Sequence, residues 1–369
     1  MRFFEFQDNA RGQTRRLLFW FAVMVLLLVL AINSALALAW ALMSAMVGGT
    51  AGGLADWGFP RYFFEVNTAV TLLFVLGGWW LETSSLRARG AGVTLARQLG
   101  AREAQPSGQP AEQRLVNIVQ EMALAASMPA PQVMVVAREH SINAFATGWD
   151  ETDAVVAVTQ GALERLDREE MQGLVAHEMS HIQEGDTRLN MRLVGMVFGL
   201  EMIHRLGAWL WAPNEKGQRH VGALFGLAIM AVGWMGWLAG HALQAAVTRQ
   251  REFLADARAV QWTRNRESLG RVLRKVWAEA DAARRDRAMA RARPVSGVAD
   301  LQNPVLQHLL LVQAEGGVVS GWFDSHPPLQ ERVRRIYGRS MSPLVVDAVP
   351  GETPPDQPPE APLHVGLRH

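Results

Sequence analysis

The chain has 369 residues, enough for one large domain or two smaller ones with a sizeable hydrophobic core. Its formal net charge of +1 argues against a nucleic-acid partner, because nucleic-acid-binding proteins usually carry an excess of basic residues. The sequence contains no cysteine. Disulfides and thiolate metal ligands are therefore excluded, and any zinc must be held by histidine and carboxylate side chains.

Hydrophobic residues make up 49% of the chain and gather in discrete blocks. After a polar N-terminal segment at 1–16, residues 17–47 carry no charge over 31 positions. As a helix this block would be about 46 Å long, which exceeds the roughly 30 Å hydrocarbon core of a bilayer. A cleaved signal peptide is the alternative, but its apolar part usually has only about 7 to 15 residues. A second apolar run follows at 62–81, so we expect two transmembrane helices within 17–81.

Arginines indicate how these two spans are oriented. The connector between the spans holds only Arg61, whereas four arginines follow the second span: Arg87, Arg89, Arg97 and Arg102. Positively charged residues flank the cytoplasmic ends of membrane helices. We therefore expect the N-terminal segment and the region after residue 82 to face the cytoplasm.

Residues 99–189 have the pattern of a folded domain outside the membrane. A linker at 103–111 precedes an amphipathic helix at 112–127. Three short β-like runs follow, at 132–137, 142–147 and 154–158. Asp167 then has the pattern of an N-cap, with Glu170 three residues on as in a capping box. The region predicts a mainly α fold with a small β-sheet beside the helix that starts at this cap.

That helix carries the H-E-x-x-H sequence at 177–181. Residues i and i+4 lie on the same helix face, so His177 and His181 can offer two imidazole nitrogens to one metal ion, with Glu178 beside them. This is the arrangement of a zinc hydrolase. The alternative is a surface helix that carries two unrelated histidines.

The chain becomes apolar again after this helix. The block at 193–211 contains Glu201 and Arg205, which are spaced to form an i,i+4 pair, so it either spans the membrane, lies at its surface or faces a protein interior. The block at 221–247 has no Asp, Glu, Lys or Arg over 27 positions. We expect residues 190–247 to form a membrane-inserted helical hairpin.

A pair of carboxylates follows the hairpin. Glu252 and Asp256 are spaced i,i+4 on a predicted helix at 248–262. A catalytic zinc usually has three protein ligands, so one carboxylate can complete the site while the other hydrogen-bonds a ligand histidine. The alternative is that both acids only pair with Arg249 or Arg251 on a helix surface.

Four separated motifs together resemble the HtpX-type membrane zinc metallopeptidases, relatives of the CAAX prenyl proteases. In chain order they are Asn143–Gly148, His177–His181, Arg251–Asp256, and Ser325–Pro328 with Arg332. The resemblance implies a zincin-like catalytic domain, built from 99–189 and 248–340, combined with about four transmembrane helices in the bacterial inner membrane. The Pro-rich tail at 342–369, expected to be disordered, is not part of the family pattern.

The resemblance implies a metal centre with one zinc ion per chain. His177, His181 and Glu252 would be its three protein ligands, and Asp256 would hydrogen-bond a ligand histidine. Glu178 would be the general base that takes a proton from the attacking water. These five residues combine the H-E-x-x-H helix with the helix that follows the hairpin.

The resemblance also implies groups that meet the substrate. His326 would donate a hydrogen bond to the developing oxyanion. Asn143 and Ala144 would lie on an edge strand that pairs with the substrate backbone, which favours broad sequence tolerance. Arg332 matches a family arginine that either acts on the substrate or braces the site.

The sequence therefore predicts a membrane zinc endopeptidase with polypeptide substrates. Because the hairpin separates His181 from Glu252, the site should lie close to the cytoplasmic membrane face, where unfolded or membrane proteins would be cut in quality control. One alternative is a membrane-anchored binding or scaffold protein with a structural zinc site. Such a site would have no use for a base such as Glu178 beside its ligands. Another is a hydrolase acting on a non-peptide amide, for which the strand at Asn143 would have no purpose.

Overall fold

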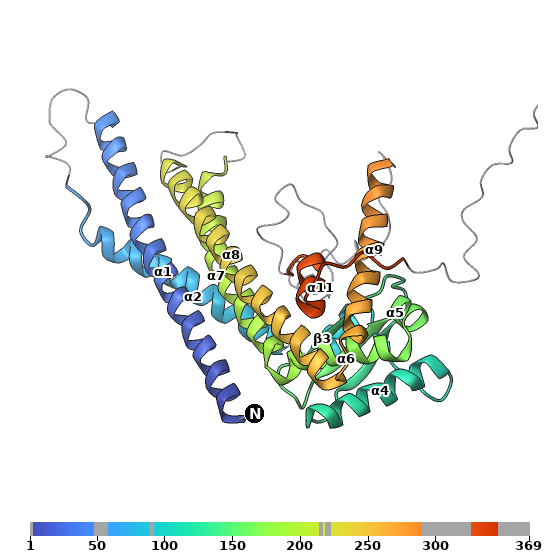
Figure 1. The fold of residues 1–369 in the computed structure, drawn as a ribbon. Helices are drawn as coiled ribbons and strands as arrows, with labels where there is room; N and C mark the ends of the chain where they lie inside the picture. Colours follow the sequence, from blue (N-terminus) through green and yellow to red (C-terminus); the bar gives the residue numbers. More distant parts are fainter. Residues whose placement is uncertain are drawn as a thin grey trace, which may run out of the picture.

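The computed structural model describes residues 3–47, 58–88, 92–213, 217, 223–289 and 326–345. Within them, four long apolar helices adjoin a mainly helical part that contains a four-stranded sheet (Figure 1). This confirms the predicted fold class. The predicted tail beyond residue 345, most of the connector between the first two helices, and Ser325 lie outside the described residues.

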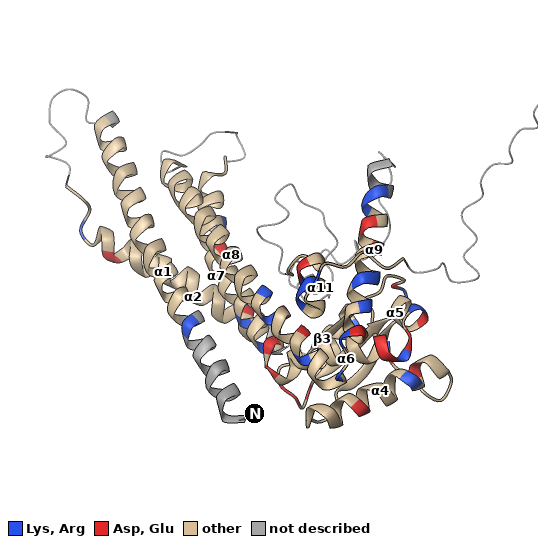
Figure 2. Cartoon of the chain, in the orientation of Figure 1, with Lys and Arg blue, Asp and Glu red and all other residues tan. Residues whose placement is uncertain are grey.

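Four helices are long and apolar enough to cross a membrane: α1 (Phe3–Val47), α2 (Phe63–Ala88), α7 (Asp186–Trp211) and α8 (Ala223–Thr263). Only 17% to 44% of the apolar window of each helix is buried inside the protein, which leaves most of its surface for lipid. Charged residues are sparse on the apolar stretches of these helices and more frequent around α6, α9 and α11 (Figure 2). The predicted number of membrane helices is therefore confirmed.

Helices α7 and α8, which include the residues of the expected membrane hairpin, follow each other in the chain and pack along each other (Figure 1). Arg205 and Glu201 of α7 form the predicted ion pair, with 2.9 Å between Nη2 and Oε1. Helix α8 has 41 residues and would measure about 60 Å, twice the hydrocarbon core. The helices predicted at 221–247 and 248–262 are therefore one continuous helix. Its last turns, with Glu252 and Asp256, extend past the apolar stretch and pack on α6.

The small sheet has the strand order β1-β2-β4-β3. β2 (Gln132–Val136), β3 (Ala144–Thr147) and β4 (Val155–Thr159) match the three predicted runs, whereas β1 (Arg102–Glu103) has only two residues and was not predicted. β1 pairs antiparallel with β2, β2 parallel with β4, and β4 antiparallel with β3. Within the described part of the chain, β3 is therefore an edge strand.

Side chains alternate between the two faces of the sheet, as the pleat requires. On one face, Val155 and Ala157 of β4 pack with α3 (Val93–Gln98). On the other face, Val156 and Val158 belong to the core formed with α4 (Pro110–Ala126), α5 (Gln160–Arg165) and α6 (Arg168–Gln183). Both faces are covered, so β4 is buried along its whole length.

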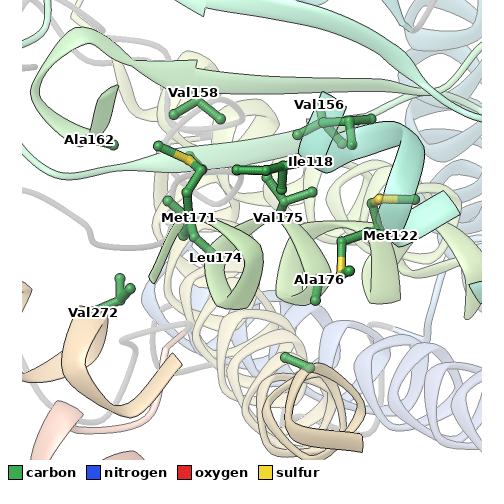
Figure 3. Close-up of a cluster of buried hydrophobic side chains, with 14 of the residues drawn as sticks. Ile118, Met122, Val156, Val158, Ala162, Met171, Leu174, Val175, Ala176 and Val272 are labelled. Atoms are coloured by element: carbon green, nitrogen blue, oxygen red, sulfur yellow. The ribbon is translucent and has the colours of Figure 1, made fainter. Parts of the chain in front are cut away.

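Helix α6 runs through the middle of this core. It starts at the predicted capping box, in which Asp167 accepts from the Glu170 backbone and the Glu170 side chain accepts from the Asp167 backbone. Met171, Leu174 and Val175 are fully buried among the strands and the neighbouring helices (Figure 3). Helices α9 (Arg266–Met289) and α11 (Leu329–Tyr337) close the core on the remaining side. The histidines of α6 are thus presented from a rigid, packed element.

Candidate metal centre and catalytic site

Helices α6 and α8 bring three potential metal ligands together. One ligand atom each from His177, His181 and Glu252 lies within 4.8 Å of the other two. The two Nε2 atoms are 3.3 Å apart, and the carboxylate oxygens of Glu252 lie 3.6 Å from His177 Nε2 and 3.5 Å from His181 Nε2. Two imidazole nitrogens and one carboxylate are a ligand set that catalytic zinc takes in proteins, with a further position left open. The three residues therefore fit a zinc ion.

A small cleft opens over these ligands. Glu178 is only 3% exposed and lines this cleft beside the two histidines. The cleft is also lined by Asp186, Thr187 and Asn190 from the first turns of α7 and by Thr248 and Arg251 of α8. The metal centre thus lies where the membrane helices meet the catalytic part.

His177 is held by charged groups from two other helices. Its Nδ1 lies 3.1 Å from Oδ1 of Asp256. Arg332 of α11, which is completely buried, donates from Nη2 and Nε to the Asp256 carboxylate at 2.7 and 2.9 Å. Its Nη1 also lies 3.0 Å from Glu252 Oε2. The structure therefore places Asp256 and Arg332 behind the ligands, with the arginine paired to both acids.

His181 is held in a matching way by residues that the sequence analysis did not assign to the site. Its Nδ1 lies 2.9 Å from Oδ2 of Asp186, and Oδ1 of Asp186 lies 3.1 Å from Nη1 of Arg251. Arg251 of α8 therefore pairs with an acid of α7. The surface-helix alternative would instead pair it with Glu252 or Asp256 of its own helix. The available signal was an acidic residue five positions after His181, shortly before the predicted hairpin.

His326 precedes α11 and enters the same cleft. Its Nδ1 lies 3.1 Å from Oε1 of Glu252, and its side chain is 14% exposed. The structure thus brings His177, Glu178, His181, Glu252 and His326 to one cleft, from three segments far apart in the chain.

The edge strand β3 reaches the cleft through Ala146. Asn143 is buried and faces β4, where its backbone exchanges hydrogen bonds with Thr159: Asn143 N donates to Oγ1 at 3.0 Å, and Asn143 O accepts from Thr159 N at 3.1 Å. Backbone groups alternate in direction along an antiparallel strand, so those of Ala144 and Ala146 point to the open edge. The N–H of Ala144 donates to the Asn143 side chain at 3.0 Å. Ala146 is therefore the residue of β3 that faces the cleft, which sequence reasoning missed.

Burial sets the electrostatics of the site. Burial raises the pKa of the Glu178 carboxyl, and the neighbouring His177 and His181 partly offset this rise. Burial lowers the pKa of His181, but hydrogen bonds with Asp186 and Glu252 outweigh it and raise the pKa overall well above its ordinary value. Carboxylates thus surround both histidines, and this environment favours a cation between them.

The fold and the site together define a metallopeptidase with membrane-spanning helices. Residues 110–340, more than half of the chain, match the model of Peptidase family M48. The chain is 35% identical over 245 residues to a Protease HtpX homolog of Lactobacillus acidophilus. The aligned region covers 64% of this chain and 76% of that protein. The chain is 32% identical over 292 residues to a Protease HtpX homolog of Acidiphilium cryptum, covering 73% of this chain and 92% of that protein.

The chain therefore belongs to peptidase family M48, among its HtpX-type membrane proteases. It is an integral membrane protein and a metallopeptidase, and its substrates are polypeptides. A crystal structure of S. mikatae Ste24p is also similar, at 16% identity and a TM-score of 0.41, covering 87% of this chain and 66% of that one.

Proposed function

We propose that this protein is a zinc endopeptidase of the bacterial inner membrane. It would cut unfolded or membrane proteins on the cytoplasmic side, as part of membrane protein quality control. The observation that carries this proposal is the convergence of two histidines and a glutamate from α6 and α8, with Glu178 beside them in an open cleft. A structural metal site is closed by a fourth protein ligand and has no use for a base. This argues against a scaffold with structural zinc.

We assign His177 and His181, through Nε2, and the Glu252 carboxylate as the zinc ligands. A zinc ion held there would supply Lewis-acid chemistry, because it lowers the pKa of a water molecule to about 7 and polarises a carbonyl group. Glu178 is then placed to take the proton of the attacking water, and its raised pKa suits a base that works near neutral pH.

His326 is the proposed hydrogen-bond donor to the developing oxyanion, since it enters the cleft beside Glu252. Losing one such donor typically raises the barrier by about 2.7 to 4 kcal/mol. For Arg332 the complete burial and the pairing with Asp256 and Glu252 favour bracing of the site over contact with substrate.

The open edge of β3 is the proposed place for the substrate backbone. Ala144 and Ala146 direct backbone groups there, and Ala146 lines the cleft. Pairing with a strand edge recognises backbone amides more than side chains. An extended, unfolded segment of almost any sequence is therefore the expected substrate.

The cytoplasmic placement rests on arginines and on topology. The N-terminal end of α1 lies at the same end of the membrane helices as α6 (Figure 1). Arginines follow α2 on that side, and positively charged flanks mark the cytoplasmic face. Because α8 runs continuously from the apolar stretch to Glu252, the cleft lies next to the membrane, which favours membrane proteins as substrates.

The decisive experiment compares wild type with Glu178→Gln in detergent, measuring bound zinc and cleavage of an unfolded protein. We expect equal zinc content and a loss of activity of at least 10²-fold, the usual contribution of a general base. The matched control is Glu169→Gln, which should retain activity. Glu169 lies in the first turn of the same helix, and its carboxylate accepts a hydrogen bond from the Asn265 side chain, away from the cleft. Equal cleavage by wild type and Glu178→Gln would refute the assignment.

A further inference from the structure

Each of the two histidines has its own carboxylate–arginine pair. Asp256 and Arg332 hold His177, and the family resemblance already anticipates their roles. Asp186 and Arg251 form the second pair, on His181. This second pair comes from the hairpin helices α7 and α8, so it links the metal centre to the part of the chain that crosses the membrane.

The geometry of Asp186 divides its two oxygens between two partners. Oδ2 lies 2.9 Å from His181 Nδ1, and Oδ1 lies 3.1 Å from Arg251 Nη1. Asp186 is 3% exposed and Arg251 is 7% exposed. A carboxylate on Nδ1 fixes the ring orientation and leaves Nε2 as the metal ligand. The buried arginine in turn neutralises the carboxylate, because an unpaired buried charge is costly.

The chain brings Asp186 back to His181 through one tight turn. Gly185, at φ +70°, separates α6 from α7 and has the left-handed conformation that favours glycine. Asp186 is the first residue of α7, where an acid also suits the helix dipole. The helix dipole alone does not explain why Asp186 is buried, because a solvent-exposed acid at this position would interact with the dipole equally well. Here the carboxylate is buried and both of its oxygens are engaged.

We propose that Asp186 and Arg251 are positioning residues for the metal centre. Asp186 orients His181 toward the metal, and Arg251 acts through Asp186 by holding its carboxylate. The first residue of α7 and a residue of α8 thereby complete the ligand geometry, so docking of the membrane hairpin on α6 prepares the site. This inference rests on the proposed zinc site.

The test measures the dissociation constant of Zn²⁺ for the full-length protein in detergent, by competition with a chromophoric chelator. Asp186→Ala removes the acceptor on His181, and we expect Zn²⁺ binding to weaken by about 10- to 100-fold, as for other partners of ligand histidines. Asp186→Asn keeps the shape and an acceptor oxygen, so its affinity should lie between those of wild type and Asp186→Ala. Arg251→Gln should weaken binding too.

A double variant tests whether Arg251 acts through Asp186. Asp186→Ala with Arg251→Gln should bind Zn²⁺ as Asp186→Ala does, because the arginine has no further route to the histidine. Losses that add independently would overturn this part of the proposal.

The matched control is Glu184→Gln. Glu184 forms a 3.0 Å ion pair with Arg258 between the end of α6 and α8, with side chains that are 10% and 13% exposed, and it does not line the cleft. We expect this variant to keep wild-type Zn²⁺ affinity, although its thermal stability should fall about as far as that of Asp186→Asn. Wild-type affinity in Asp186→Ala and Asp186→Asn, or equal weakening in Glu184→Gln, would overturn the inference. Weak Zn²⁺ binding by wild type would instead refute the proposed zinc function.

Discussion

Arg332 shows how one side chain can organise a site by charge and by directed hydrogen bonds. Its charge is completely buried, which would be costly if it were unpaired. Ion pairs with Asp256 on one side and Glu252 on the other stabilise the buried charge. Two acids placed that close would repel each other in a buried site without a cation between them. The guanidinium has a rigid planar fork of donors, which suits two carboxylates better than a lysine would.

We predict that Arg332→Gln destabilises the protein by about 3 to 5 kcal/mol, because it leaves buried carboxylates without their partner. Unfolding in detergent, followed by circular dichroism, would measure this loss. Arg334→Gln is the matched control on the same helix, since Arg334 is exposed and surface substitutions usually change stability by less than about 0.5 kcal/mol. Equal stabilities of the two variants would contradict the bracing role.

At the scale of elements, the membrane helices pack through glycines. Gly199 of α7 lies directly against the backbone of Val75 in α2, and an added Cβ there would clash with the Val75 carbonyl oxygen. Val75 is fully buried at this contact. Small residues let helix backbones approach closely in membranes, where packing replaces the hydrophobic effect as the driving force.

We therefore expect Gly199→Ala to lower the thermal unfolding temperature in detergent, with a cost of about 1 to 3 kcal/mol from overpacking. Gly77→Ala in α2 is the control, because an added Cβ there meets no atom of the described residues within 4 Å. A Gly199→Ala protein as stable as Gly77→Ala would contradict a tight contact between α2 and α7 at this position.

At the scale of the whole molecule, the candidate metal centre and the apolar helices are not independent modules. Helix α8 belongs to both, since it carries an apolar stretch and then Glu252. Helix α7 belongs to both as well, since it starts at Asp186 beside His181 and continues as an apolar helix. The cleft is therefore built partly from the same helices that carry the apolar stretches.

We predict that an unfolded segment anchored to a membrane helix is cut faster than the same segment as a soluble peptide. The measurement is the cleavage rate of both substrates by the protein reconstituted in vesicles, with Glu178→Gln as the inactive control. Anchoring confines the substrate near the cleft and so raises its effective concentration. Efficient degradation of the soluble peptide, with the anchored substrate left intact, would contradict membrane proteins as substrates.

Much of the local structure could be predicted because it depends on near neighbours in the chain. The capping box at Asp167 and the strands β2 to β4 follow from short local patterns, and the four apolar helices follow from long stretches with few charged residues. β1 was missed because two residues carry no period, and its strand character comes only from pairing with β2. The continuity of α8 was missed because a change from apolar to charged residues was taken as a boundary.

The sequence by itself determined that His177 and His181 share a helix face with Glu178 between them, since this follows from 3.6 residues per turn. It also supplied Glu252 and Asp256 as candidates of the right chemistry. The i,i+4 spacing left open which of the two acids meets the metal, and the family resemblance implied Glu252. The tertiary structure places Glu252 against both histidines, whereas Asp256 contacts Nδ1 of His177. It likewise decided that Arg251 pairs with Asp186. The physical reason is that these contacts depend on how α7, α8 and α11 pack against α6, which no local spacing specifies.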